Sequence, residues 1–165
     1  DKNFDTNWKN SKKAGITTGA YHFMSFESPG VDQAKNYIKT VPKEKDSLPP
    51  VVDFEYYGKF EKNHPSQETV DKILKPLLKK LKDHYGKDPI IYVNSNMYKK
   101  YISGKYKNRI WLADLKAPKK LPDGRSWEFL QYSFNSKLTK YAGGIPHLDL
   151  NVFRGSRFSF AAKYL

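Results

Sequence analysis

The sequence contains no cysteine, only four arginines among its 30 basic residues, and no stretch of 18 apolar residues. The lack of cysteine excludes a disulfide framework, a thiolate zinc site and a cysteine nucleophile. The lack of a long apolar run predicts that no helix spans a membrane. The opening residues, Asp1 to Asp5, carry no signal-peptide pattern, so a secreted form would have to be processed or truncated.

The charge is strongly basic, with 30 Lys and Arg against 17 Asp and Glu and a net charge of +13. Direct reading of nucleic-acid bases relies on arginine, so the scarcity of arginine argues against a nucleic-acid partner. Scattered lysines instead attract any polyanion diffusely. That attraction suits an anionic membrane surface or an acidic wall polymer. The alternative is that the lysines only solvate the outer faces of helices.

Length and composition predict one globular domain over residues 1–165, and we expect a monomer. Hydrophobic residues make up 38% of the chain and aromatic residues 15%. This is enough apolar material for a sizeable core. No internal repeat or low-complexity linker divides the sequence.

Apolar periodicity predicts helices that alternate with strands through most of the chain. Helices are expected over residues 5–14, 31–38, 66–85 and 96–102. Strands are expected over residues 16–24, 51–55, 89–93, 109–113, 127–132 and 147–153, with a turn at Gly143-Gly144 before the last. Ser66 suits the N-cap of the third helix, Gly86 should end it, and Pro76 should kink it.

The order of these elements predicts an α/β fold. Alternating strands and helices in the early part favour a parallel sheet, while the later strands have no helices between them. A TIM-like β/α barrel with reduced helices in its C-terminal half fits both parts. In such barrels the active site lies at the C-terminal ends of the strands.

The most informative segment is Leu48-Pro-Pro-Val-Val-Asp-Phe-Glu-Tyr56. It predicts a buried strand that ends in two carboxylates, Asp53 and Glu55. Side chains alternate along a strand, so these two carboxylates share a face and lie about 7 Å apart along the chain. Like charges this close push their pKa values apart, so one group can hold a proton while the other is ionised. Cleavage of a glycosidic bond needs such a pair.

The motif by itself leaves another interpretation open. Asp-x-Glu is a common tripeptide, and both carboxylates could be hydrogen-bonded or salt-bridged at the end of a strand. The histidines offer no alternative chemistry, because they do not combine with carboxylates at metal-ligand spacing or in a Ser-His-Asp arrangement. His22 is expected to be a hydrogen-bonded core residue.

Six segments, in this order along the chain, resemble glycoside hydrolase family 25, the lysozymes typified by fungal, bacterial and phage muramidases. They cover nearly the whole chain. The segments are Gly19-Ala-Tyr-His-Phe23, Leu48 to Glu55, Pro89-Ile-Ile-Tyr92, Ile110-Trp-Leu-Ala113, Trp127-Glu-Phe-Leu-Gln-Tyr132 and Asp149-Leu-Asn-Val-Phe153.

The resemblance implies an eight-stranded β/α barrel that cleaves the β-1,4 bond between N-acetylmuramic acid and N-acetylglucosamine in peptidoglycan. It implies no metal and no organic cofactor. It makes Glu55 the general acid, with Asp53 orienting the acetamido group of the substrate, which would act as an internal nucleophile. It also places Asp149 in the site. Such an enzyme would be secreted, associated with the cell wall or delivered by a phage.

The chain departs from the family pattern at its start. Family members usually open with a strand that carries Asp-Val-Ser, followed by a second strand, and this chain begins after both. We therefore expect an N-terminally incomplete domain with about six of the eight barrel strands. A barrel without two neighbouring strands has open edges.

Four further residues are candidates for the sugar-binding cleft. Tyr21, Tyr92 and Trp111 could stack on sugar rings, and Gln131 could hydrogen-bond them. The alternative for each is a packing role in the core. A non-catalytic module that binds wall glycan remains the second functional hypothesis.

Overall fold

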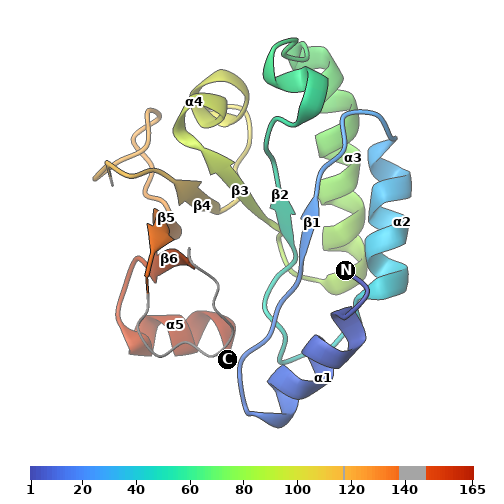
Figure 1. The fold of residues 1–165 in the computed structure, drawn as a ribbon, viewed down its shortest axis with the longest axis vertical. Coiled ribbons are helices and arrows are strands. Elements are labelled where there is room, and N and C mark those ends of the chain that lie inside the picture. Colours follow the sequence, from blue (N-terminus) through green and yellow to red (C-terminus); the bar gives the residue numbers. More distant parts are fainter. Residues whose placement is uncertain (117, 138–147) are drawn as a thin grey trace.

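The computed structural model describes residues 1–116, 118–137 and 148–165 (Figure 1). The expected turn at Gly143-Gly144 and His147, the first residue of the last expected strand, lie outside the described residues. One six-stranded sheet runs through the structure, with its strands in sequence order. The strands are β1 (Tyr21–Phe23), β2 (Val51–Asp53), β3 (Ile90–Asn94), β4 (Ile110–Ala113), β5 (Phe129–Ser136) and β6 (Leu148–Phe153).

Strands β1 to β5 are parallel, and β6 pairs antiparallel with β5. The sheet curls into half of a barrel, which confirms the predicted barrel-type α/β fold. The helices are α1 (Phe4–Lys13), α2 (Gly30–Thr40), α3 (Gln67–Tyr85), α4 (Ser95–Met97) and α5 (Arg157–Tyr164). Figure 1 shows α2 and α3 side by side along one side of the sheet, and α5 near β6 at the other end.

Helix α3 forms as its sequence predicts. The Ser66 hydroxyl accepts a hydrogen bond from the Thr69 amide, and Gly86 ends the helix with φ of +68°. Its buried face packs towards the sheet and consists of Val70, Ile73, Leu74, Leu77, Leu78 and Leu81. Pro76 lies inside the helix, which is continuous on both sides of it.

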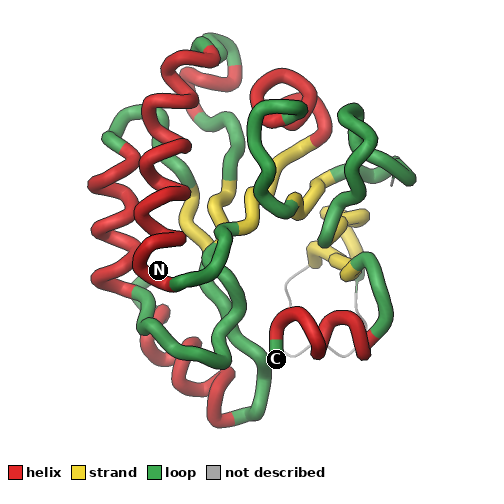
Figure 2. The backbone as a smooth tube through the Cα atoms, turned by 180° about the vertical axis from the view of Figure 1, so that it is seen from behind, coloured by secondary structure: helices red, strands yellow, loops and turns green. Residues whose placement is uncertain are grey.

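Helices α2 and α3 approach each other closely at Gly30. A Cβ atom at this position would lie 1.9 Å from the carbonyl oxygen of Ile73. Only glycine therefore permits this crossing, because a backbone atom cannot move aside as a side chain can. Figure 2 shows the two helices as a pair seen from behind.

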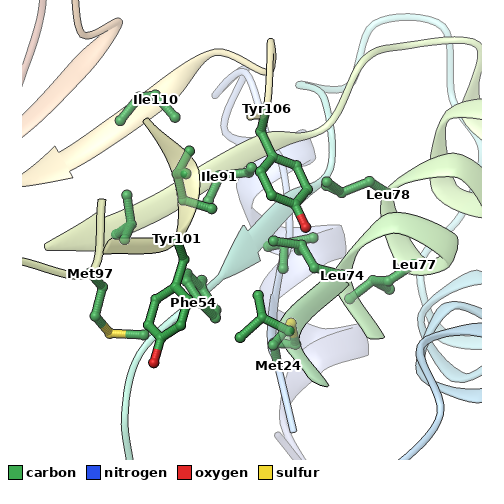
Figure 3. Close-up of a cluster of buried hydrophobic side chains, with 14 of the residues drawn as sticks. Met24, Phe54, Leu74, Leu77, Leu78, Ile91, Met97, Tyr101, Tyr106 and Ile110 are labelled. Carbon is green, nitrogen blue, oxygen red and sulfur yellow. The ribbon is translucent and has the colours of Figure 1, made fainter. Parts of the chain in front are cut away.

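The sheet separates two apolar clusters. The larger lies between the sheet and helices α1 to α3, and Figure 3 shows part of it, with Met24, Phe54, Leu74 and Ile91. The smaller lies on the concave face, where α5 covers the sheet. It contains Val51, Ile90, Tyr164, Trp111, Phe129, Phe153 and Phe160. The concave face is therefore closed at one end by aromatic side chains.

Several elements differ from the prediction. The first strand is short because Pro49 and Pro50 on its neighbour have no amide hydrogen with which to extend the ladder. The segment 57–65, for which neither a helix nor a strand is expected, contains a 3₁₀ turn, Gly58–Glu61. The helix expected over residues 96–102 is α4 followed by a π-helical turn, Tyr98–Ile102.

Helix α5 was not predicted. Its N-cap signal is Ser156, whose hydroxyl accepts a hydrogen bond from the Ser159 amide. In the part of the chain that the structure describes, no helix has the length and apolar character that a membrane span requires.

Candidate active site

The strand expected over residues 51–55 is shorter in the structure: β2 ends at Asp53, and Glu55 follows just beyond its C-terminal end. Asp53 pairs with Phe23 on one side and Tyr92 on the other. Its carbonyl oxygen accepts a hydrogen bond of 2.9 Å from the Met24 amide, and the Phe54 amide donates to the Tyr92 carbonyl oxygen at 2.9 Å. Phe54 is fully buried on the helix side. Asp53 and Glu55 consequently point to the concave face.

A cavity of about 280 Å³ occupies this concave face. All seven residues singled out from the sequence line it, although they come from six different strands or strand ends. The lining residues are Tyr21, Val51, Asp53, Glu55, Tyr92, Trp111, Gln131, Asp149 and Asn151. Their convergence is a finding of the structure; the role of each residue remains a prediction.

Val51 and Asn151 are the lining residues that sequence reasoning missed. Each lies two positions from a predicted carboxylate on the same strand, Val51 before Asp53 and Asn151 after Asp149. The alternation of side chains along a strand would have been the signal that identified them.

Asp53 is an unusual carboxyl group. Burial, together with the nearby charge of Glu55, raises its pKa to about 7. Its Oδ1 atom is buried and has no hydrogen-bond partner among the described residues. A buried acceptor without a partner is costly, so this oxygen is available to a hydrogen-bond donor that enters the cavity.

Glu55 is also perturbed. Burial raises its pKa first, and the charge of Asp149 adds to the effect. None of the ion pairs formed by the described residues involves Asp53, Glu55 or Asp149. The charge of Glu55 therefore raises the pKa of Asp53, the charge of Asp149 raises the pKa of Glu55, and no ion pair among the described residues offsets either effect.

Aromatic side chains form one wall of the cavity. The rings of Tyr92 and Trp111 meet edge to face, with centroids 5.6 Å apart. Trp111 also packs against Phe129 at 5.7 Å, and its indole Nε1 donates a hydrogen bond of 2.9 Å to Asn151 Oδ1. Tyr21, at the other side, is 70% exposed. Burial and the nearby carboxylates raise the pKa of the Tyr92 phenol, so it remains a hydrogen-bond donor.

Gln131 contributes a buried amide to the cavity. Its side chain is only 5% exposed, and among the described residues it forms no side-chain hydrogen bond. His22 lies outside this cavity and bonds Gln33 Oε1 at 2.9 Å, in keeping with the expected hydrogen-bonded histidine. The described residues contain no group of three or more metal-ligating side chains.

A larger cavity, of about 520 Å³, lies between β1, α1 and α2. Asp1 is its only carboxylate, and residues such as Trp8 and Tyr37 from the two helices line it. It lacks a pair of acidic groups that could work together. The smaller cavity is therefore the candidate active site.

The chain is similar to a known protein family and to several solved structures. The sequence model of the Glycosyl hydrolases family 25 matches residues 1–140. The structure of a family 25 glycosyl hydrolase from Bacillus anthracis is similar with a TM-score of 0.92 and 40% identity, over 100% of this chain and 76% of that chain. A bacterial lysozyme from Streptomyces coelicolor shares the fold, with a TM-score of 0.80 and 24% identity over 99% of this chain and 79% of that chain.

The uncharacterized protein YegX of Escherichia coli is 31% identical over 158 residues. The match covers 94% of this chain and 55% of that protein. The chain thus spans about half the length of the curated relatives that it matches.

Proposed function

Because this chain belongs to glycosyl hydrolase family 25, we propose that it hydrolyses the β-1,4 bond between N-acetylmuramic acid and N-acetylglucosamine in peptidoglycan. The observation that carries the proposal is the convergence of Asp53, Glu55 and Asp149 on one cavity with an aromatic wall. The similarity to a bacterial lysozyme, which shares the fold, is consistent with it.

Glu55 is the proposed general acid. Its raised pKa keeps the carboxyl group protonated to higher pH than an ordinary glutamate. As the bond between the sugar C1 and the leaving oxygen breaks, Glu55 gives its proton to that oxygen. In the second half of the reaction the Glu55 carboxylate takes a proton from the attacking water, which restores the acid.

Asp53 is proposed to orient the acetamido group of the substrate. The carbonyl oxygen of that group attacks C1 from within the sugar, while its N–H donates a hydrogen bond to the enzyme. The buried Oδ1 of Asp53 has no partner among the described residues, so it offers an acceptor for this N–H. An ionised Asp53 stabilises the positive charge that develops on the acetamido group.

The remaining lining residues would hold the glycan. Asp149 raises the proton affinity of Glu55 through its charge. Tyr21, Tyr92 and Trp111 offer faces for sugar rings, and the buried amide of Gln131 offers a donor and an acceptor. No metal or organic cofactor takes part in the proposed reaction.

A second candidate function is glycan binding without hydrolysis. It is favoured by the half-barrel sheet, in which β1 and β6 are edge strands, so the cavity has no strand on its outer sides among the described residues. In this case the aromatic wall would bind the sugar while the carboxylates are held too loosely for catalysis.

Reducing-end release from purified peptidoglycan distinguishes the two functions. The chain and its Glu55→Gln variant are compared, and product masses are read. Products that end in muramic acid, formed by the chain and lost in the variant, support the muramidase. A folded chain that binds the glycan but releases no ends supports the binding module and contradicts the hydrolase.

The setting proposed for this activity is the bacterial wall. The protein would act as a monomer that is secreted, wall-associated or carried by a phage, with its net charge of +13 adding attraction to anionic wall polymers. Nucleic acid is not a proposed partner.

A further inference from the structure

Asn151 lies on the same face of β6 as Asp149. The two residues are two positions apart, and both line the candidate active-site cavity. In the sheet, Asn151 stands directly opposite Gln131 of β5. Asn151 therefore lies in the site, close to the carboxylates, and its side chain carries no charge.

The side chain of Asn151 reaches across a whole strand. Its Oδ1 accepts a 2.9 Å hydrogen bond from the indole of Trp111 on β4, although β5 lies between the two strands. Strands two apart are separated by about 9.6 Å in a flat sheet. The curl of the half-barrel brings the two side chains together on the concave face, and their combined length closes the remaining gap.

Trp111 needs a contact of this kind to keep one orientation. Its ring meets Tyr92 edge to face at 5.6 Å and Phe129 at 5.7 Å, so two aromatic rings contact it. Such contacts are weakly directional in comparison with a hydrogen bond. The indole N–H can only donate, and Asn151 is the acceptor that determines which way this edge of the ring points.

We propose that Asn151 is a positioning residue, which acts through Trp111 by holding the indole as a platform for a sugar ring of the glycan. This inference rests on the proposed function. The amide of Asn151 itself does not contact the reacting atoms. Removing its side chain therefore weakens glycan binding by freeing the indole, and leaves the acid chemistry of Glu55 and Asp53 unchanged.

A double-mutant cycle tests this role in the Glu55→Gln background, in which the glycan is not consumed. Soluble peptidoglycan tetrasaccharide is titrated against the background protein, against Asn151→Ala, against Trp111→Phe and against both together, with tryptophan fluorescence or calorimetry as the readout. We expect Asn151→Ala to weaken binding about fivefold, the usual value of one hydrogen bond. In the Trp111→Phe background the same change should weaken binding by less than about twofold.

A ligand-free measurement accompanies the titration. The indole N–H signal of Trp111, identified by its loss in Trp111→Phe, should exchange with solvent faster in Asn151→Ala than in the parent. Asn135→Ala, an asparagine on the exposed part of β5, is the matched control and should change neither readout. Thermal unfolding of each variant shows whether the sheet is intact.

The outcomes separate cleanly. Equal losses of affinity from Asn151→Ala in both backgrounds would show that Asn151 acts independently of Trp111 and overturn the inference. Unchanged affinity or unchanged indole exchange in Asn151→Ala would overturn it as well, as would a protein that does not bind the glycan. Failure of the proposed function is a different result, since it is seen as absent hydrolysis by the unsubstituted chain, while the binding cycle is still measured.

With the unsubstituted Glu55, the kinetics give a further check. Asn151→Ala should raise KM about fivefold and change kcat by less than about twofold, with the pH profile of kcat unmoved. A shift of that profile would mean that Asn151 acts on the carboxylates, which the inference excludes.

Discussion

Phe54 and Glu55 are neighbours in the chain, but their side chains lie on opposite faces of the sheet. Phe54 is fully buried in the cluster beneath helices α1 to α3, and Glu55 lines the cavity on the concave face. The hydrogen bond from the Phe54 amide to the Tyr92 carbonyl oxygen, 2.9 Å long, holds this segment against β3. The core on one side of β2 thus determines the direction of the carboxylate on the other.

Replacement of Glu55 by Gln tests the acid role. We expect the rate of reducing-end release to fall by about 100-fold or more, because the amide cannot donate a proton to the leaving group. The fold should be retained, since the change removes a carboxyl group whose pKa is raised by burial. Full activity in a folded Glu55→Gln variant would rule out the assignment.

Asp53 should make stability depend on pH. Its pKa is raised from 3.8 to about 7, so the folded state binds this proton more tightly than the unfolded state. The contribution of the group is most favourable below its unfolded pKa and is lost as the pH rises towards 7. The free energy of unfolding should therefore fall through this range because of Asp53.

The matched variant is Asp53→Asn, which keeps the shape and removes the titration. Denaturant unfolding at several pH values should give a flatter dependence on pH in this variant than in the parent. An identical pH dependence in both proteins would mean that Asp53 titrates normally, and would remove the physical basis for its special role. We expect Asp53→Asn also to lower hydrolysis, because the amide cannot stabilise positive charge on the acetamido group.

Gly30 should tolerate no side chain. A Cβ atom there would meet the Ile73 carbonyl oxygen at 1.9 Å, so Gly30→Ala must push α2 away from α3. We expect the free energy of unfolding to drop by about 2 kcal/mol or more, measured by urea denaturation. Asn36→Ala, on the exposed face of the same helix, serves as the control and should stay within about 0.5 kcal/mol of the parent. A stable Gly30→Ala protein would show that the two helices can separate freely.

Helix α5 should stabilise the concave face through Phe160. Its ring packs on Phe153 at 5.3 Å and on Tyr164 at 5.1 Å. Phe160→Ala should therefore cost about 2 kcal/mol in the free energy of unfolding, below the value for a fully buried phenylalanine because the ring is only partly buried. Phe158→Ala is the matched control, since Phe158 is 87% exposed on the same helix. Equal effects of the two changes would mean that α5 does not pack as described.

Binding to the wall should weaken as salt rises. With a net charge of +13, part of the affinity for an anionic wall comes from screened long-range attraction. Co-sedimentation with insoluble wall material at increasing ionic strength should show less bound protein, and walls stripped of their anionic polymers should show a smaller effect. Binding that does not respond to salt would mean that the lysines solvate the protein surface and do not contribute to wall binding.

Much of the site could be predicted from the sequence because strands alternate their side chains. Asp53 and Glu55 could be assigned to one face, and the order of the family-like segments brought Tyr92, Trp111 and Gln131 to successive strands. The N-cap of α3 at Ser66 and its end at Gly86 could also be predicted from the sequence, because capping depends on a few adjacent residues. Each of these predictions uses information local in the chain.

Helix α5 and the contact between Asn151 and Trp111 could not be predicted in the same way. The local pattern of aromatic residues in α5 does not indicate what the helix packs against. The curled sheet provides that surface. The pairing of Asn151 with Trp111 links β6 to β4 across β5. No spacing in the sequence indicates that two side chains 40 residues apart will meet in this way.

By itself, the sequence determined which side chains of each strand share a face and where a helix such as α3 begins and ends. Both depend on backbone periodicity and on neighbouring side chains. Only the tertiary structure decided how far the sheet curls. That curl sets the distances between strands that do not pair, and with them the burial that raises the pKa of Asp53 and Glu55. Desolvation depends on everything that surrounds a group in space, so it is a property of the folded chain.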